Sequence, residues 1–371
     1  MINHAELRAG ELVEVRSKKE ILATLDKNGQ LEALPFMPEM FKFCGKQFRV
    51  FRRAHKTCDP PNGLHGRRML HAVHLEGTRC DGREHGGCQA RCLIFWKEAW
   101  LKRVGVDESL QTSGSVNNWE TGAVTDADVL AGTRNLAAEV DVNDPVYVCQ
   151  STRIAQATLP LPSWDWRQYL EDYTSGNVKF SQLLSSFFFF LYSQLVSAGI
   201  GLGSILRWGY DRIQNWRRAT PYPIRQGKIP HGTKTPSAEL HVRPGELVRI
   251  RTYQEILATL DENGLNRGMW FDAEMVPYSG KTYRVLDRVN TIINEKTGKM
   301  QHLKNACIML EGVVCLACYS KYRRFCPRSI YPYWREVWLE RVQSKMPADE
   351  PKEEEEASDS HVSAAPTLSE G

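Results

Sequence analysis

With 371 residues the chain is long enough for two or three domains, each with its own core. The net charge of +4 conceals an imbalance, because residues 346–371 hold eight acidic residues against the single Lys352, and the remainder is correspondingly basic. A basic body is suited to nucleic acid, an anionic membrane or an acidic partner, but basic residues dispersed over a solvated surface give the same composition. The polar start from Met1 to Leu7 has no apolar run behind it, which argues against a secretory signal and predicts a cytosolic protein.

The chain contains an internal repeat. Gly10 to Val13 and Glu20 to Asp26 recur 235 residues later as Gly245 to Val248 and Glu255 to Asp261. The same offset continues to Gly312, and beyond it an offset of 238 relates Cys88, Trp96 and Trp100 to Cys326, Trp334 and Trp338. Chance does not produce a match of this length, so we interpret residues 1–104 and 237–345 as two copies of one module, called copy one and copy two below.

The start of each copy favours a strand followed by a short helix. Leu12 to Val15 has the composition of a strand. Ser17 and Glu20 then form a capping box, which predicts a helix from Glu20 to Asp26, and copy two keeps the same signal in Thr252 and Glu255.

The rest of each copy predicts a hairpin and a closing helix. Gly45 to Phe51 alternates as a strand does, and Ala72 to Leu75 is its expected partner. The spacing of Trp96 and Trp100 predicts a final helix whose apolar stripe packs on the sheet. We therefore expect an α+β fold with two repeated small SH3-like barrel modules, which carry cysteine-rich metal-binding ends and are joined by a central helical segment.

The region between the copies divides into two parts. Residues 105–145 are rich in Ser, Thr, Asn, Asp and Gly and predict a flexible loop. Residues 146–236 form the central helical segment, which begins with a short strand at Val146 to Cys149 and continues with an amphipathic helix opened by Pro160 to Trp166.

A hydrophobic helix is predicted over residues 181–206, which contain no charged residue. That length is enough to cross a bilayer, but the polar residues and glycines within it weaken this interpretation. A crossing helix would also place one set of thiols in an oxidising compartment. We favour a helix that lies at a membrane surface or is buried between the copies, with a membrane span as the alternative. The arginines and aromatic residues that follow, from Arg207 to Arg218, suit anionic headgroups.

Four cysteines of copy two, Cys307, Cys315, Cys318 and Cys326, are spaced as C-x7-C-x2-C-x7-C. Four soft ligands within twenty residues are typical of a closed tetrahedral zinc site. In copy one the expected ligands are Cys58, Cys80 and Cys88, with Cys92 or His85 as the fourth. Cys58 is placed in this set because a hairpin would bring it across from the Ala72 region, where copy two has Cys307. The sequence thus predicts two zinc sites, one in each copy.

Other roles for the cysteines remain open. Disulfides, an iron–sulfur cluster and unligated buried thiols are the alternatives to zinc, and the Cys315 to Cys318 turn is also compatible with thiol redox chemistry. Cys44 and Cys149 are interpreted as packed thiols, because neither has a cysteine at the equivalent position.

The two modules, Gly10 to Val104 and Gly245 to Val342, and the aromatic runs that close them resemble a family of uncharacterised bacterial proteins. This resemblance implies no activity and no catalytic residue. The acidic segment 346–371 behind copy two predicts a disordered tail.

Our first hypothesis is a non-catalytic cytosolic zinc-binding protein, whose tandem modules present a basic face to a protein partner or to an anionic membrane surface; nucleic acid is the less supported partner. The second is a metal-dependent enzyme that uses the copy-one site, with His71, His74 and His85 nearby and Glu76 and Glu84 as candidate bases. The third is a thiol redox protein.

Overall fold

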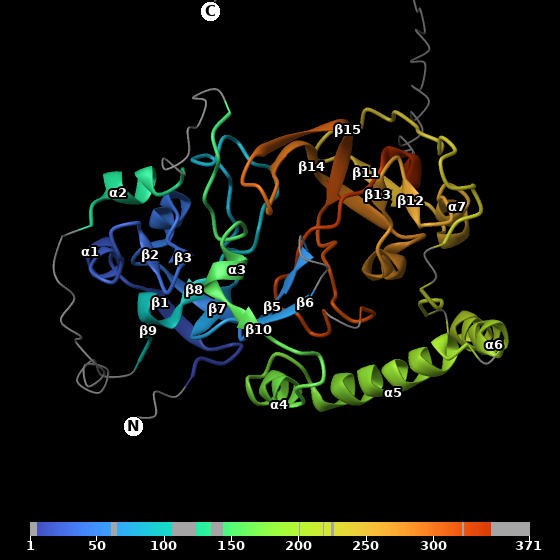
Figure 1. Cartoon of the computed structure of the whole chain (residues 1–371), viewed down its shortest axis with the longest axis horizontal. Coiled ribbons are helices and arrows are strands. Elements are labelled where there is room, and N and C mark those ends of the chain that lie inside the picture. The colour runs from blue at the N-terminus through green and yellow to red at the C-terminus, as the bar shows by residue number, and fades with distance from the viewer. Residues whose placement is uncertain are drawn as a thin grey trace, which may run out of the picture. The chain divides into compact units, whose positions relative to one another are not determined.

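The computed structural model describes residues 6–60, 65–105, 124–134, 144–199, 201–217, 219–223, 226–320 and 323–342. The predicted acidic tail and most of the predicted 105–145 loop lie outside these residues. The described part has a mixed α+β fold built from several small antiparallel sheets (Figure 1).

Copy one is built on a five-stranded antiparallel sheet with the strand order β8-β7-β4-β1-β9. Its strands and helices, including the short 3-10 helices η1 and η3, are β1 (Leu12–Val15), α1 (Lys18–Leu22), β2 (Gln30–Leu31), β3 (Leu34–Pro35), η1 (Pro38–Phe43), β4 (Gln47–Arg53), β5 (Lys56–Asp59), β6 (His65–Arg68), β7 (Ala72–Leu75), β8 (Trp96–Lys97), η3 (Glu98–Trp100) and β9 (Leu101–Arg103).

Copy two is built on a four-stranded antiparallel sheet with the order β15-β14-β11-β16. Its elements are β11 (Leu247–Ile250), α7 (Tyr253–Leu257), β12 (Leu265–Asn266), β13 (Met269–Trp270), η5 (Ala273–Tyr278), β14 (Thr282–Ile293), β15 (Met300–Leu310), η6 (Glu336–Trp338) and β16 (Leu339–Arg341). Each copy has a hydrophobic core of its own, as the length of the repeat predicts.

The strand registers of the two sheets match residue for residue. Val13 faces Phe48 and Arg103 in copy one, and Val248 faces Tyr283 and Arg341 in copy two. These are the positions related by the offsets of 235 and 238. The pairing of β4 with β7 and that of β14 with β15 are also irregular at the same place, after Val50 and after Val285. The repeated sequence therefore forms the same strand pairs in both copies.

Two local predictions are confirmed and one is wrong. Both capping boxes form, with Ser17 and Glu20 at α1 and with Thr252 and Glu255 at α7. The predicted closing helix is instead a strand, a single 3-10 turn and a second strand in copy one, and an isolated bridge at Trp334, a 3-10 turn and a strand in copy two. The two tryptophans still become fully buried, because Trp96 lies on β8 and Trp100 on η3, both of which face the core.

The copies differ in the outer part of the hairpin. In copy two, β14 and β15 continue as one long hairpin to the turn between Ile293 and Met300. In copy one the corresponding strands are interrupted, and β5 and β6 form a separate sheet with β10 (Leu159–Pro160). This second sheet is where copy one receives additional chain from the region between the copies.

That region contains the helices α2 (Asp126–Ala131), α3 (Ile154–Ala157), α4 (Arg167–Thr174), α5 (Phe180–Ser197) and α6 (Gly203–Trp216). The expected strand at residues 146–149 makes only isolated bridges, at Val146 and Tyr147. The single hydrophobic helix predicted over 181–206 is two helices, because the chain adopts positive φ at Gly199 and Gly201 between them.

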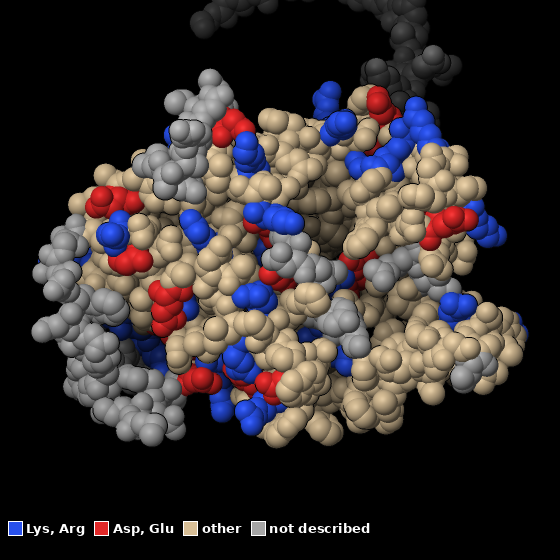
Figure 2. Space-filling view, viewed as in Figure 1, with Lys and Arg blue, Asp and Glu red and all other residues tan. Residues whose placement is uncertain are grey.

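Helix α5 is not buried between the copies, since none of its residues is buried. Phe187, Phe188 and Leu191 are among its exposed apolar side chains. Within the described residues, no helix combines the length and apolarity needed to cross a membrane. Figure 2 shows both signs of charge scattered over one face of the molecule, with the band over α5 and α6 largely uncharged.

Candidate metal centre

The loop between Cys80 and Cys92 carries most of the predicted copy-one ligands. Its two ends run antiparallel, with a bridge between Arg79 and Leu93 and a hydrogen bond of 2.9 Å from the Cys80 N–H to the Cys92 carbonyl. The loop turns tightly at Gly82, where φ is +68° and a Cβ atom would lie 2.0 Å from the Cys88 carbonyl oxygen. Only glycine fits there, so this residue lets the loop fold back and bring its cysteines together.

Four thiols line one small cavity of ≈ 30 Å³: Cys80, Cys88, Cys92 and Cys149. This volume is large enough for a guest of about the size of a water molecule. Cys149 approaches from the region between the copies, where its N–H donates to Thr152 Oγ1 at 2.9 Å. Ile293 of copy two also lines the cavity, and its N–H lies 3.4 Å from Cys88 Sγ.

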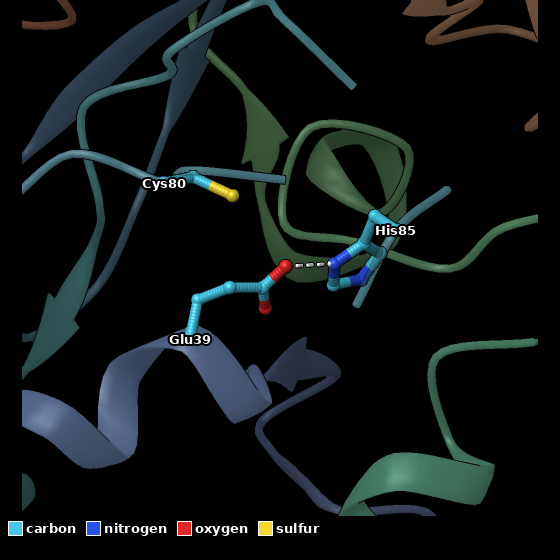
Figure 3. Close-up of side chains that lie close together, drawn as sticks. All are labelled: Glu39, Cys80 and His85. Carbon is cyan, nitrogen blue, oxygen red and sulfur yellow. Dashed lines mark hydrogen bonds and ion pairs between the residues drawn. The ribbon is translucent and has the colours of Figure 1, made fainter. Parts of the chain in front are cut away.

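A carboxylate and an imidazole lie beside one of these thiols, that of Cys80 (Figure 3). Glu39 of η1 and His85 are both buried, and Glu39 Oε1 is 2.7 Å from His85 Nδ1. His85 Nε2 lies 3.0 Å from the Val148 carbonyl and donates to it, because a carbonyl oxygen only accepts. Among the described residues, Glu39, Cys80 and His85 are the one set of three metal-type ligands whose donor atoms all lie within 4.8 Å of one another.

Burial raises the pKa of every thiol around the cavity. For Cys80 the effect of burial is reinforced by the carboxylate of Glu39 and by Cys92. Burial raises the pKa of Cys149 to about 12, again with a contribution from Cys92. Without a cation these thiols are therefore protonated at neutral pH and are poor nucleophiles, and a bound metal ion must displace their protons.

The structure does not bring the four predicted ligands of copy two together. Cys307 lies in a separate cluster, where its Sγ is 3.7 Å from Met269 Sδ and accepts a hydrogen bond of 3.7 Å from Arg335. Cys326 instead lies in a different buried cluster, and the partly buried Cys315 packs against that cluster. Cys318 is exposed, and its thiol donates to the Leu316 carbonyl at 3.3 Å.

Cys58 is also not where the predicted hairpin would place it. On β5 it faces Gly66 of β6, because the interruption after β4 directs this strand away from the Ala72 region. Its side chain packs with Cys326 of copy two rather than with the thiols of copy one. The hydrogen bond from the Cys58 thiol lowers the pKa of Cys326 to about 6.

Of the residues considered for acid–base catalysis, only His85 lies beside the thiols. His71, Glu76 and Glu84 are exposed, whereas His74 is fully buried and its Nδ1 lies 2.8 Å from the Ile94 carbonyl. Burial lowers the pKa of His74 to about 3, which keeps this imidazole neutral.

Sequence reasoning missed two residues of the candidate centre, Cys149 and Glu39. Cys149 has no equivalent in copy two, so the repeat carried no signal for it. A signal for Glu39 was present, because the acid recurs as Glu274. Glu274 is also buried, and its oxygens accept the N–H groups of Cys318 and Tyr319 at 2.9 and 2.8 Å.

Comparison of this chain with protein-family models, with curated proteins and with solved structures found no match. The resemblance to a family of uncharacterised bacterial proteins therefore stays a prediction.

Proposed function

We propose that this chain is a non-catalytic zinc-binding protein of the cytosol, in which Cys80, Cys88, Cys92 and Cys149 hold one zinc ion as thiolates. The observation that carries the proposal is that these four thiols surround a single cavity. Zinc accepts four thiolates in a tetrahedron, with Zn–S distances of about 2.3 Å. A set of four protein ligands leaves no position for substrate, so the role of the ion is structural.

In our proposal Glu39 and His85 do not bind the ion, and they support the centre from outside its ligand set. The equivalent acid, Glu274, accepts backbone N–H groups of the copy-two cysteine loop. Glu39 does the same in copy one, since its Oε1 lies 3.2 Å from the Glu84 nitrogen. The shared task of the two acids is therefore to hold a cysteine loop. The competing ligand set is Glu39, Cys80 and His85, whose donor atoms are already close.

Substitutions separate the two ligand sets. Cys149→Ser or Cys88→Ser should remove the ion of this centre, whereas Glu39→Gln should retain it, because an amide oxygen still accepts the Glu84 N–H. Zinc per chain is measured by elemental mass spectrometry on the purified full-length protein. Cys44→Ser is the matched control, since Cys44 is half-buried and does not line the cavity. Loss of zinc in Glu39→Gln with full zinc in Cys149→Ser would favour the mixed ligand set.

The modules are proposed to be SH3-like, and the surface of α5 and α6 is proposed to rest on an anionic membrane. Trp208 and Trp216 of α6 are exposed beside the exposed Arg212 and Arg217. Exposed aromatic side chains next to cations suit the boundary between headgroups and acyl chains. The apolar side chains of α5 extend the same kind of surface.

Vesicle sedimentation tests this surface. The full chain should bind vesicles that contain phosphatidylserine, and Trp208→Ser with Trp216→Ser should weaken binding while leaving the zinc content unchanged. Trp270→Ser is the control, because Trp270 is equally exposed on β13 of copy two. Equal loss of binding in the control, or no binding to anionic vesicles at all, would contradict the proposed membrane contact.

A further inference from the structure

Thiols from both copies meet in one buried cluster. Cys58 of copy one and Cys326 of copy two pack together with Ala317, and Cys315 packs against them. Both Cys58 and Cys326 are buried in this cluster, so a residue of copy one and a residue of copy two lie side by side there. The cluster thus combines one cysteine of copy one with two of copy two.

The cysteine loop of copy two folds back on itself. Ala317 adopts the left-handed conformation, with φ of 54°, between Cys315 and Cys318. The Phe325 N–H donates to the Ala317 carbonyl at 2.8 Å, and this contact brings Cys326 back to the C-x2-C turn. Cys318 leaves the same turn as Cys315, and Glu274 holds its N–H at 2.9 Å. Cys318 is therefore the thiol that the same turn offers as a fourth ligand.

Two arginines lie beside the cluster. Arg323 Nη1 lies 3.9 Å from Cys315 Sγ, and the buried Arg328 donates to the Cys58 carbonyl at 3.4 Å. A zinc ion with four thiolates carries a net charge of about −2, which cations at this distance would offset. Arg323 is also paired with Asp272 and Arg328 with Glu295, so the two guanidinium groups offset the charge of a thiolate centre only in part.

Equivalent positions of the two copies also make equivalent contacts with the opposite copy. The offset of 235 relates Cys58 to Ile293, and the offset of 238 relates Cys88 to Cys326. Ile293 of copy two lies against Cys88 of copy one, just as Cys58 of copy one lies against Cys326 of copy two. Each copy therefore sends the same position of its hairpin to the cysteine loop of the other. That position is Cys58 in copy one but Ile293 in copy two, so only copy one contributes a thiol to the other copy.

We propose that Cys58, Cys315, Cys318 and Cys326 hold a second zinc ion, which ties copy one to copy two. This inference rests on the proposed function, because it assumes that the chain binds zinc, but it uses none of the ligands of the first centre. Binding deprotonates the four thiols and releases their protons to solvent. The ion acts as a crosslink between segments that are far apart in the sequence.

Separate substitutions of Cys58 and Cys307 test the inference, because only Cys58 is a proposed ligand of the second ion. Zinc per chain is measured on the full-length protein by elemental mass spectrometry, and thiolate coordination is followed by the charge-transfer band of the Co²⁺-substituted protein. Cys58→Ser should reduce the content from about two ions to about one, whereas Cys307→Ser should leave it at about two. The opposite result, with loss in Cys307→Ser and none in Cys58→Ser, would overturn the inter-copy site.

Two further variants keep the outcome interpretable. Cys58→His retains a zinc ligand of suitable type and should restore the second ion, which separates loss of a ligand from failure to fold. Cys88→Ser should remove only the first ion. If the wild-type chain holds one zinc that Cys58→Ser removes and Cys88→Ser retains, the first centre fails and the second stands. If Cys88→Ser removes that single ion and Cys58→Ser retains it, the inference fails alone.

Discussion

The cysteine loops of the two copies keep two equivalent positions and differ in the others. Cys88 of copy one corresponds to Cys326 of copy two, and Cys80 corresponds to Cys315, because their N–H groups donate to the equivalent carbonyls of Cys92 and Ile330. In copy one, the remaining thiols of the cavity come from the loop itself and from Cys149. In copy two, a thiol arrives from the opposite copy. The difference shows that a duplicated module can preserve part of a thiol cluster while neighbouring segments supply the rest.

The outer hairpins differ in a related way. The long hairpin of β14 and β15 extends past the sheet of copy two, and Asn290 on it is exposed. The equivalent part of copy one is covered, so Lys56 is buried and its Nζ lies 2.5 Å from Asp172 Oδ2 of α4. Copy one therefore depends on the central region for its stability more than copy two does.

Asp172→Asn, in helix α4 of the central region, is the substitution expected to lower the free energy of unfolding most. It tests the dependence of copy one on that region. The substitution leaves the ammonium group of Lys56 buried without its carboxylate, and breaking a buried pair in this way costs about 3–5 kcal/mol in the free energy of unfolding. Urea denaturation measures the loss. The control is Asn290→Ala, which should change stability by less than about 0.5 kcal/mol because the side chain is exposed. Equal effects of the two substitutions would remove this distinction between the hairpins.

His74 should make copy one more sensitive to acid than copy two. Its pKa is about 3 in the folded chain and 6.5 in the unfolded one, so between these values the unfolded state binds the extra proton. The contribution of the neutral His74 to the free energy of unfolding is then fully present above pH 6.5 and is lost as the pH falls toward 3. The loss is about 2 kcal/mol between pH 6.5 and 5.

Copy two has the fully buried Met309 at the position of His74, which makes His74→Met the matched substitution. Urea denaturation of both proteins across this pH range should show a shallower loss for the variant. Parallel pH profiles would show that His74 does not limit acid stability.

Substitutions of Thr78 and of Val313, which occupy equivalent positions, should change stability by smaller amounts. The two changes should have opposite signs. Thr78 Oγ1 accepts from Trp96 Nε1 at 3.1 Å, whereas Trp334 Nε1 is buried without a hydrogen-bond partner within the described part of copy two. Thr78→Val should cost about 1–3 kcal/mol, because it leaves the Trp96 N–H unsatisfied.

Val313→Thr supplies the missing acceptor and should stabilise copy two by about 0.5–1.5 kcal/mol. The midpoint of thermal unfolding reports both changes. Destabilisation by Val313→Thr would mean that the hydroxyl is not accommodated as it is in copy one.

The local part of the fold was predictable from the sequence, because each signal lies within a few residues of its effect. The capping residue Ser17 and its glutamate are three residues apart, and the box they form appears as expected. The spacing of Trp96 and Trp100 was misleading, since a strand followed by a 3-10 turn buries two tryptophans as well as a helix does. Spacing alone does not distinguish these two backbones.

The thiol clusters were less predictable, because they depend on contacts between distant segments. Cys149 follows Cys92 by more than fifty residues and reaches the cavity only through the path of the central region. The position of Cys58 depends on how the two copies pack against each other. Neither contact leaves a pattern in the spacing of cysteines along the chain.

The zinc content of the native full-length chain is the most direct test of this account. Elemental mass spectrometry of protein purified without added metal or chelator should find about two zinc ions per chain, and their removal should abolish cooperative thermal unfolding. A folded, cooperatively unfolding chain that contains no metal, and whose ten cysteines all titrate as free thiols, would contradict the account.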